Sequence, residues 1–245
     1  MGRADQKHSR WVRVARRVLL LCIVLGLGLI VTYRLWVPKV LLIYTLHELR
    51  DVHLNTVPVH KELVRSVSAF GKLYRVDGVT FSTPWTDEMQ VHSNASVLTV
   101  RFRTGVTGHF KGIMVMQDTP TFRDTLVDGS SEVRTFFGPS SVTNYDLYTE
   151  MINLTPADIH FFSSNADSLS KSILLTLKSK MQFISTPIYS FTTQNGFRGF
   201  EFVPSATSTL VELFSPKDEQ YEVLISGATP LETDAVLQSF KELGN

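Results

Sequence analysis

The sequence predicts an α+β fold: an antiparallel sheet with helices on its faces, preceded by one transmembrane helix and a helical stalk. Three observations lead to this prediction. Residues 18–37 form a long apolar run near the N-terminus. Later segments alternate apolar and polar residues with the period of strands, and others repeat apolar residues with the period of helices. Hairpin signals separate several of the strands, so neighbouring strands are expected to be antiparallel.

Residues 18–37 have the length and character of a membrane-spanning helix. Residues 18–31 read VLLLCIVLGLGLIV and carry no charge. About twenty such residues are what an α-helix needs to cross a hydrocarbon layer roughly 30 Å thick. Tyr33 and Trp36 suit the interfacial aromatic belt. The alternatives are a cleaved signal peptide and a buried core helix, but residues 33–40 contain no small-residue cleavage pattern, which favours an uncleaved signal-anchor.

Positive charge is concentrated before this run, in a basic tail at residues 1–17. After the uncharged residues 18–31, only Arg34 and Lys39 precede Arg50. The positive-inside rule therefore predicts a cytoplasmic N-terminus and an extracytoplasmic C-terminal domain, at a plasma membrane or a bacterial inner membrane. The first expected partner is accordingly the lipid bilayer, contacted through the transmembrane helix.

Residues 72–245 have the composition of one extracytoplasmic α+β domain. Hydrophobic residues make up 43% of the 245-residue chain and charged residues 19%, which is an ordinary globular balance. The net charge is +1 although the tail is basic, so the exterior domain is slightly acidic and is not expected to bind nucleic acid. The one cysteine, Cys22, lies in the apolar run, so the domain depends on its apolar core rather than on a disulfide.

Residues 38–71 are predicted to form a helical stalk that Gly71 ends. Apolar residues recur at helical spacing from Leu42, Pro58 interrupts them, and residues 59–70 resume the pattern. We expect the stalk to pack on the domain. The alternative is pairing with a second copy, which is less favoured because the pattern is not a sustained heptad. The oligomeric state is left open.

The domain begins with predicted strands. Residues 73–82 alternate about Asp77-Gly78, a strong signal for a two-residue hairpin. A polar loop is expected over residues 86–94. Two further strands that pair with each other are expected at residues 97–103 and 110–117.

Helical periodicity follows in the middle of the chain. Helices are predicted at residues 142–154, for one turn at 155–158, and for a longer stretch capped by Ser164 or Asn165. The longer helix carries one apolar stripe, formed by Leu169, Ile173, Leu174, Leu177 and Met181. Its polar side is expected to include Ser170, Lys171 and Lys178.

The last third is predicted to be a four-stranded meander followed by a helix. The strands are expected at residues 188–193, 197–203, 209–214 and 221–226. Thr229 and Glu232 have the spacing of a capping box, with Pro230 at the first helical position. We expect this helix to reach Leu243. Its inward residues are expected to be Leu231, Ala235, Val236 and Phe240.

Two segments in this order of elements resemble the PsbP-like family: VTFSTPWTD near the start of the domain and VLQSFKEL at its end. The residues that carry the resemblance are Phe81, Pro84, Trp85, Ser239 and Phe240. It spans residues 73–243 and implies an antiparallel sheet sandwiched by helices, with a binding or assembly role rather than an enzymatic one. The membrane anchor departs from the soluble members of the family, so their partners are not carried over.

His47-Glu48 and the later His53 are similar at first sight to a zinc-binding helix. That motif requires its second histidine four residues after the first, where Asp51 stands. A metal site would need convergent ligands, and exposed histidines are the expected outcome.

Glycines at positions 105, 108 and 112 surround His109 and Lys111, in an arrangement that invites comparison with a phosphate-binding loop. Their spacing does not match a P-loop, and the segment joins two strands rather than a strand and a helix. A hairpin loop is therefore expected.

No catalytic set emerges from the remaining motifs. Serine pairs at residues 130–131 and 140–141 lack the flanking residues of a nucleophile elbow. Three acidic residues form either a carboxylate cluster or a solvated loop: Asp124, Asp128 and Glu132. Four aromatic residues are expected in the sheet core rather than in a binding groove: Phe197, Phe200, Phe202 and Tyr221. We therefore predict no catalytic, cofactor-binding or metal-binding residue.

These observations favour a single-pass, membrane-anchored protein whose exterior domain binds or scaffolds a protein partner. The first alternative is a small membrane-tethered hydrolase, which would need a pocket with two or more ionisable groups within hydrogen-bond reach. The second is a carrier of an apolar ligand, which would need a cavity of several hundred Å³ between sheet and helices.

Overall fold

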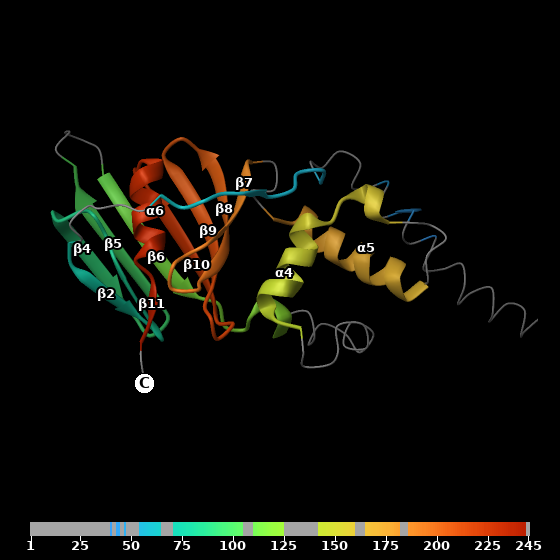
Figure 1. Ribbon diagram of the computed structural model, residues 1–245, viewed down its shortest axis with the longest axis horizontal. Helices are drawn as coiled ribbons and strands as arrows, with labels where there is room; N and C mark the ends of the chain where they lie inside the picture. The colour runs from blue at the N-terminus through green and yellow to red at the C-terminus, as the bar shows by residue number, and fades with distance from the viewer. Residues whose placement is uncertain are drawn as a thin grey trace, which may run out of the picture.

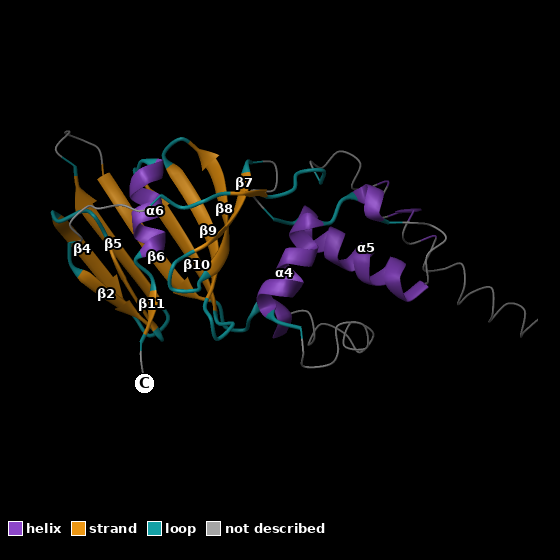
Figure 2. Cartoon of the chain, viewed as in Figure 1, coloured by secondary structure: helices purple, strands orange, loops and turns teal. Residues whose placement is uncertain are grey.

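The computed structural model describes residues 40, 43, 44, 47, 54–64, 71–104, 110–124, 142–159, 165–181 and 186–243. Within these ranges the chain forms two sheets and several helices (Figures 1 and 2), which confirms the α+β prediction. The predicted transmembrane helix and most of the predicted stalk lie outside the described residues. Among the described helices, none is long and apolar enough to span a membrane.

The larger sheet has eight strands in the order β1-β7-β8-β9-β10-β6-β5-β4. Every neighbouring pair is antiparallel except β1 and β7, so the sheet is mixed. The strands are β1 Val59–His60, β4 Glu88–Ser93, β5 Val97–Arg103, β6 Phe110–Gln117, β7 Ile188–Thr192, β8 Arg198–Ser205, β9 Ser208–Phe214 and β10 Gln220–Ser226. The pairing of β10 with β6 joins the predicted meander to the earlier strands.

A three-stranded sheet and the helices complete the fold. The smaller sheet contains β2 Leu73–Val76, β3 Val79–Ser82 and β11 Lys241–Glu242. The helices are α4 Asn144–Asn153, the 3₁₀ turn η2 Pro156–Asp158, α5 Asn165–Ser179 and α6 Pro230–Gln238. The predicted hairpin, the middle helices and the four-stranded meander are therefore confirmed.

The larger sheet is covered on both faces, because its strands alternate apolar side chains between two cores. One core lies under α6 and the smaller sheet and includes Val211, Leu213 and Tyr221. The other lies under α4 and α5 and includes Phe200 and Phe214. In Figure 1, α6 crosses the strands while α4 and α5 lie to the right of β8 and β10.

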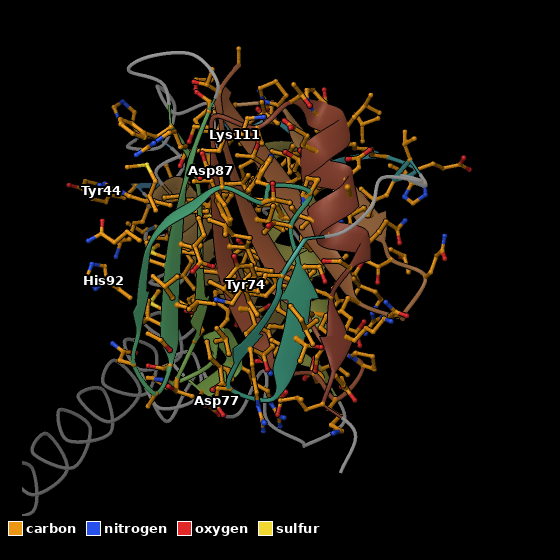
Figure 3. The ribbon with its side chains drawn as sticks, turned by 90° about the vertical axis from the view of Figure 1, so that its left-hand side faces the viewer. Tyr44, Tyr74, Asp77, Asp87, His92 and Lys111 are labelled. Atoms are coloured by element: carbon orange, nitrogen blue, oxygen red, sulfur yellow. The ribbon has the colours of Figure 1, made fainter. Side chains whose placement is uncertain are left out.

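All four aromatic residues weighed above as a possible groove are buried, which confirms the core interpretation. Tyr74 of the smaller sheet also lies in the core, where its ring packs against those of Phe81 and Phe102. Figure 3 looks towards this end of the molecule and shows Tyr74 near its middle and His92 of β4 at the outer edge.

The polar loop predicted at residues 86–94 is wrong, because Glu88–Ser93 is the edge strand β4. Every residue of β4 is exposed. A strand that buries neither face need not alternate apolar and polar residues, and so periodicity does not reveal it.

The helical stalk prediction is wrong at residues 59–64. Val59–His60 forms β1, parallel to β7, and residues 61–64 are not helical. Leu54 and Leu63, on either side of this strand, are buried in the two cores, so the segment packs on the domain. A two-residue strand is too short to leave a pattern in the sequence.

The C-terminal helix is shorter than predicted, since α6 ends at Gln238 and residues 241–242 pair with β3. The capping box at Thr229 and Glu232 is present, as predicted. Leu231 was expected to point inward but is 61% exposed, whereas Ala235 and Val236 are buried as expected. Pairing with β3 thus overrides the helical periodicity of the last residues.

Lys178 was placed on the polar side of α5, but it is fully buried. Its ammonium group donates to the carbonyl oxygens of Leu54, Thr56 and Leu154 at 3.1, 2.9 and 2.7 Å. These carbonyl groups lie outside any ladder at that point and need a donor, which a buried lysine supplies. Lys178 therefore joins α5 to the segment before β1 and to the end of α4.

Candidate functional site

A cavity of about 320 Å³ lies between the larger sheet and the helices α4 and α5. We call it the helix-side cavity. Its walls are mostly apolar, and three of its side chains are strongly polar. It is lined by Asp118, Pro120, Phe122, Tyr148, Met151, Leu177, Met181, Glu212 and Gln220.

The sheet places the polar side chains on one face through its period of two. Val211 and Leu213 turn towards the α6 side, so Glu212 between them faces the helix pair. Glu222 of β10 is the register partner of Glu212, and Asp118 directly follows β6, where its backbone N–H donates to the Gln220 carbonyl at 2.9 Å. Asp118, Glu212 and Glu222 together form what we call the carboxyl cluster.

Gln220 fixes the position of Glu212. Its amide nitrogen donates to a carboxylate oxygen of Glu212 at 3.1 Å, and its amide oxygen accepts from the backbone N–H of Phe122 at 3.0 Å. With only 4% of its surface exposed, Gln220 is part of the core. It therefore links one polar wall of the cavity to the segment that carries Phe122.

The helix α4 brings Tyr148 and Met151 to the opposite wall. Asp218, in the left-handed region at φ 69°, accepts hydrogen bonds from the backbone N–H groups of Asn144 and Tyr145 and so holds the first turn of α4 near the sheet. The Tyr148 ring then packs against Phe200 with a centroid separation of 5.4 Å. Aromatic contacts thus set the depth at which this tyrosine enters the cavity.

The Tyr148 hydroxyl has no hydrogen-bond partner among the described residues, although only 3% of the residue is exposed. Leaving a buried hydroxyl unpaired costs about 1–3 kcal/mol. Such groups are rare in folded proteins, and a molecule bound in the cavity would supply the missing partner.

The cavity favours protonated carboxyl groups. Burial, with a contribution from the negative charge of Asp118, raises the pKa of Glu212 to about 8. Burial also raises the pKa of Asp118 to about 6, with help from the charge of Glu222. The pKa of Tyr148 is raised above its ordinary value by burial and then by the carboxyl cluster. None of the described lining residues is basic, so none of them offsets this negative charge.

A second cavity, of about 580 Å³, lies on the α6 side of the sheet. Its lining is largely apolar and includes Tyr189, Val203 and Ala228. At its edge the Lys61 ammonium is 2.7 Å from a carboxylate oxygen of Glu201 and 2.7 Å from one of Asp234. We call these three residues the ion triad.

The ion triad fastens the segment around β1 to the sheet and to α6. Glu201 lies on β8 and Asp234 on α6, and their side chains are 4% and 3% exposed. Asp234 also accepts a hydrogen bond from the backbone N–H of Val64 at 3.0 Å. The triad therefore has a structural role that explains its burial.

Among the described residues of the site motifs weighed from the sequence, none lines either cavity. His47 and His60 are exposed, and Asp124 accepts hydrogen bonds from Thr121. Asp128, Glu132, the serine pairs and the glycines at 105 and 108 lie outside the described residues, and Gly112 lies within β6. Within the described ranges no group of three or more His, Cys, Asp or Glu is arranged to hold a metal ion.

Sequence reasoning missed the polar residues of the helix-side cavity. One signal was available: Glu212 is the single charged residue in the strand TLVELF, which is apolar on both sides of it. A charge on a strand that buries both faces indicates a buried polar site. The contribution of Tyr148 from α4 carries no comparable signal, since an aromatic residue at helical spacing is usually core.

Comparison of the chain with protein-family models and with curated proteins finds no match. The two segments that carry the PsbP-like resemblance contact each other. The rings of Phe81 and Phe240 stack at a centroid distance of 5.0 Å, and the backbone N–H of Ser82 donates to the Ser239 hydroxyl at 2.9 Å. These contacts give the residues a packing role, and the family itself stays a prediction.

Proposed function

We propose that this protein is a membrane-anchored binding module whose extracytoplasmic domain takes a small molecule in the helix-side cavity. The observation that carries the proposal is the unpaired, buried hydroxyl of Tyr148 beside the carboxyl cluster, in walls that are mostly apolar. Ligand cavities typically combine apolar walls with a few polar groups that orient the ligand, and their volumes begin at about 300 Å³.

The composition of the lining favours binding over hydrolysis. Among the described residues that line the cavity there is no serine, cysteine, histidine or lysine. Glu212 and Asp118 can exchange protons near neutral pH, but the described lining places no serine, cysteine, histidine or lysine beside them to act as a partner in hydrolysis.

At least one of three small molecules that each carry one aromatic ring is expected to stabilise the full chain against heating. Suitable probes are 2-phenylethylamine, 2-phenylethanol and 3-phenylpropionate, which share a shape and differ in charge. A ligand at a hundred times its Kd adds about 2.7 kcal/mol, which corresponds to roughly 5–10 °C in Tm for a domain of this size. Thermal melting of the full chain in a mild non-ionic detergent measures the shift.

The variant Leu177→Trp fills the cavity and is expected to lose this stabilisation. Leu231→Trp is the matched control, because Leu231 is exposed on α6, away from the cavity. No shift with any of the three probes, or an equal shift in Leu177→Trp, would rule out the helix-side cavity as the binding site.

A second candidate function is the carriage of an uncharged apolar ligand in the α6-side cavity, which the volume of about 580 Å³ and the apolar lining favour. The same melting experiment separates the two. A shift from 2-phenylethanol that survives Leu177→Trp but is lost in Ala206→Trp, which narrows the α6-side cavity, supports this second function.

The membrane anchor is proposed from the apolar run at residues 18–37 and the basic tail before it. The full chain is expected to stay with the membrane pellet after alkaline carbonate extraction, because a spanning helix is not released by breaking ionic contacts. A variant without residues 18–37 is expected in the supernatant. Release of the intact full chain by carbonate would contradict the anchor.

A further inference from the structure

The described groups that face the helix-side cavity are acidic or neutral, and none of them is basic. The sheet side contributes Asp118, Glu212 and the neutral amide of Gln220, and α4 contributes the Tyr148 phenol. Glu222 of the carboxyl cluster lies beside Glu212 in the sheet. The α5 side contributes Leu177 and the adjoining Met181, which are apolar. Lys178, which follows Leu177 on α5, donates to backbone carbonyl oxygens and is not among the lining residues. An anionic ligand would therefore be repelled.

The lining of the cavity also favours an organic cation over a metal ion. Metal ions such as Ca²⁺ and Mg²⁺ require several oxygen ligands converging on one point, and the described carboxylates do not form such a group. Aromatic rings and thioethers instead attract an organic cation with an apolar body, and Phe122, Tyr148, Met151 and Met181 supply them.

We propose that the helix-side cavity binds an organic ammonium ion with an apolar body, and that the Glu212 carboxylate is its counter-ion. This inference rests on the proposed function, since it names the class of ligand for the same cavity. In the complex, the Tyr148 hydroxyl donates a hydrogen bond to the ligand or accepts one from it. Gln220 acts as a positioning residue, because its side-chain amide holds the Glu212 carboxyl group in place and carries no charge of its own.

Binding of an ammonium ion is coupled to the release of a proton. At neutral pH the Glu212 carboxyl is mostly protonated, because its pKa is about 8. The carboxylate form pairs with the ammonium ion, so the complex holds one proton fewer than its separate parts. Affinity therefore rises with pH, by up to about tenfold per unit, until the pH reaches about 8.

Titration calorimetry of the full chain with the three probes tests the ligand class. At about pH 8, 2-phenylethylamine is expected to bind at least about tenfold more tightly than 2-phenylethanol, because its ammonium group makes a charge-assisted hydrogen bond that the alcohol cannot make. Binding of 3-phenylpropionate is expected to be too weak to measure. Lowering the pH to about 6 is expected to weaken binding of the amine and to leave the affinity for the alcohol unchanged.

Two variants connect the preference to named residues. Glu212→Gln is expected to remove the preference for the amine and its pH dependence, whereas Glu150→Gln, on the exposed side of α4, is expected to keep both. Tyr148→Phe is expected to lower the affinity for the amine by about threefold to tenfold. The same variant is expected to make the ligand-free protein more stable, because the unpaired hydroxyl is gone.

The outcomes separate this inference from the proposed function. If 2-phenylethanol binds as tightly as the amine and Leu177→Trp abolishes both, the binding module stands and the ammonium ligand is wrong. If the amine binds equally well to Glu212→Gln, the assignment of the counter-ion is wrong. If none of the probes binds, both proposals fail.

Discussion

Replacing Lys61 with methionine is expected to lower the free energy of unfolding by about 3–5 kcal/mol, because it leaves two buried carboxylates without their counter-ion. Glu201 and Asp234 are both within 2.7 Å of the Lys61 ammonium, and their side chains are almost fully buried. Burial of Lys61 opposes its charged form, but the hydrogen bonds to Asp234 and Glu201 outweigh this effect and raise its pKa. Urea unfolding followed by tryptophan fluorescence measures the loss.

Lys72→Met is the matched control for this prediction. Lys72 pairs with Glu88 at 3.2 Å, but its side chain is 64% exposed, so its loss is expected to change stability by less than about 1 kcal/mol. A triple variant that adds Glu201→Gln and Asp234→Asn to Lys61→Met is expected to recover a large part of the loss, because no buried charge is left unpaired. Equal effects of the two lysine variants would show that the ion triad does not fasten the segment around β1.

The fold is expected to lose stability as the pH rises from about 5 to about 8, on the order of 3 kcal/mol through Glu212 and Asp118. In the unfolded chain these carboxyl groups have ordinary pKa values of 4.5 and 3.8. In the folded domain the values are raised to about 8 and about 6. Between these limits the folded state holds more protons than the unfolded chain, so raising the pH favours unfolding.

The variant Glu212→Gln is expected to flatten most of this pH dependence and to be more stable than the natural chain at about pH 8. Glu150→Gln, an exposed change, is expected to leave the profile as it is. Above this window Lys178 adds the opposite trend, since burial lowers its pKa to about 8. A stability that stays level or rises between pH 5 and 8, measured by urea unfolding at each pH, would show that the Glu212 carboxyl is ionised in the folded state.

Elements that bury one face were predictable from the sequence, and elements that depend on a distant partner were not. Residues 97–103 alternate because one side of β5 is core, and the pattern was sufficient. Edge strand β4 and the short strand β11 have no such pattern. They exist because β5 and β3 offer free backbone groups to pair with, which is information from the tertiary structure.

Buried polar residues were the other features that could not be predicted from the sequence. Lys178 looks like a solvated residue of an amphipathic helix, yet three carbonyl groups from two distant segments surround its ammonium. Likewise, the cavity brings together Asp118, Tyr148 and Glu212 from segments far apart in the chain. Spacing within a sequence reports neighbours along one element and does not report convergence of several elements in space.

The proton released on binding is the most direct measure of the proposed site. Calorimetry of 2-phenylethylamine binding at about pH 7, in buffers of different ionisation enthalpy, gives the number of protons released per ligand. We expect roughly one proton from the natural chain, because a carboxyl group with a pKa near 8 must ionise to pair with the ammonium, and close to none from Glu212→Gln. Binding without proton release in the natural chain, or with equal release in both proteins, would contradict the pairing of a bound ammonium ion with Glu212.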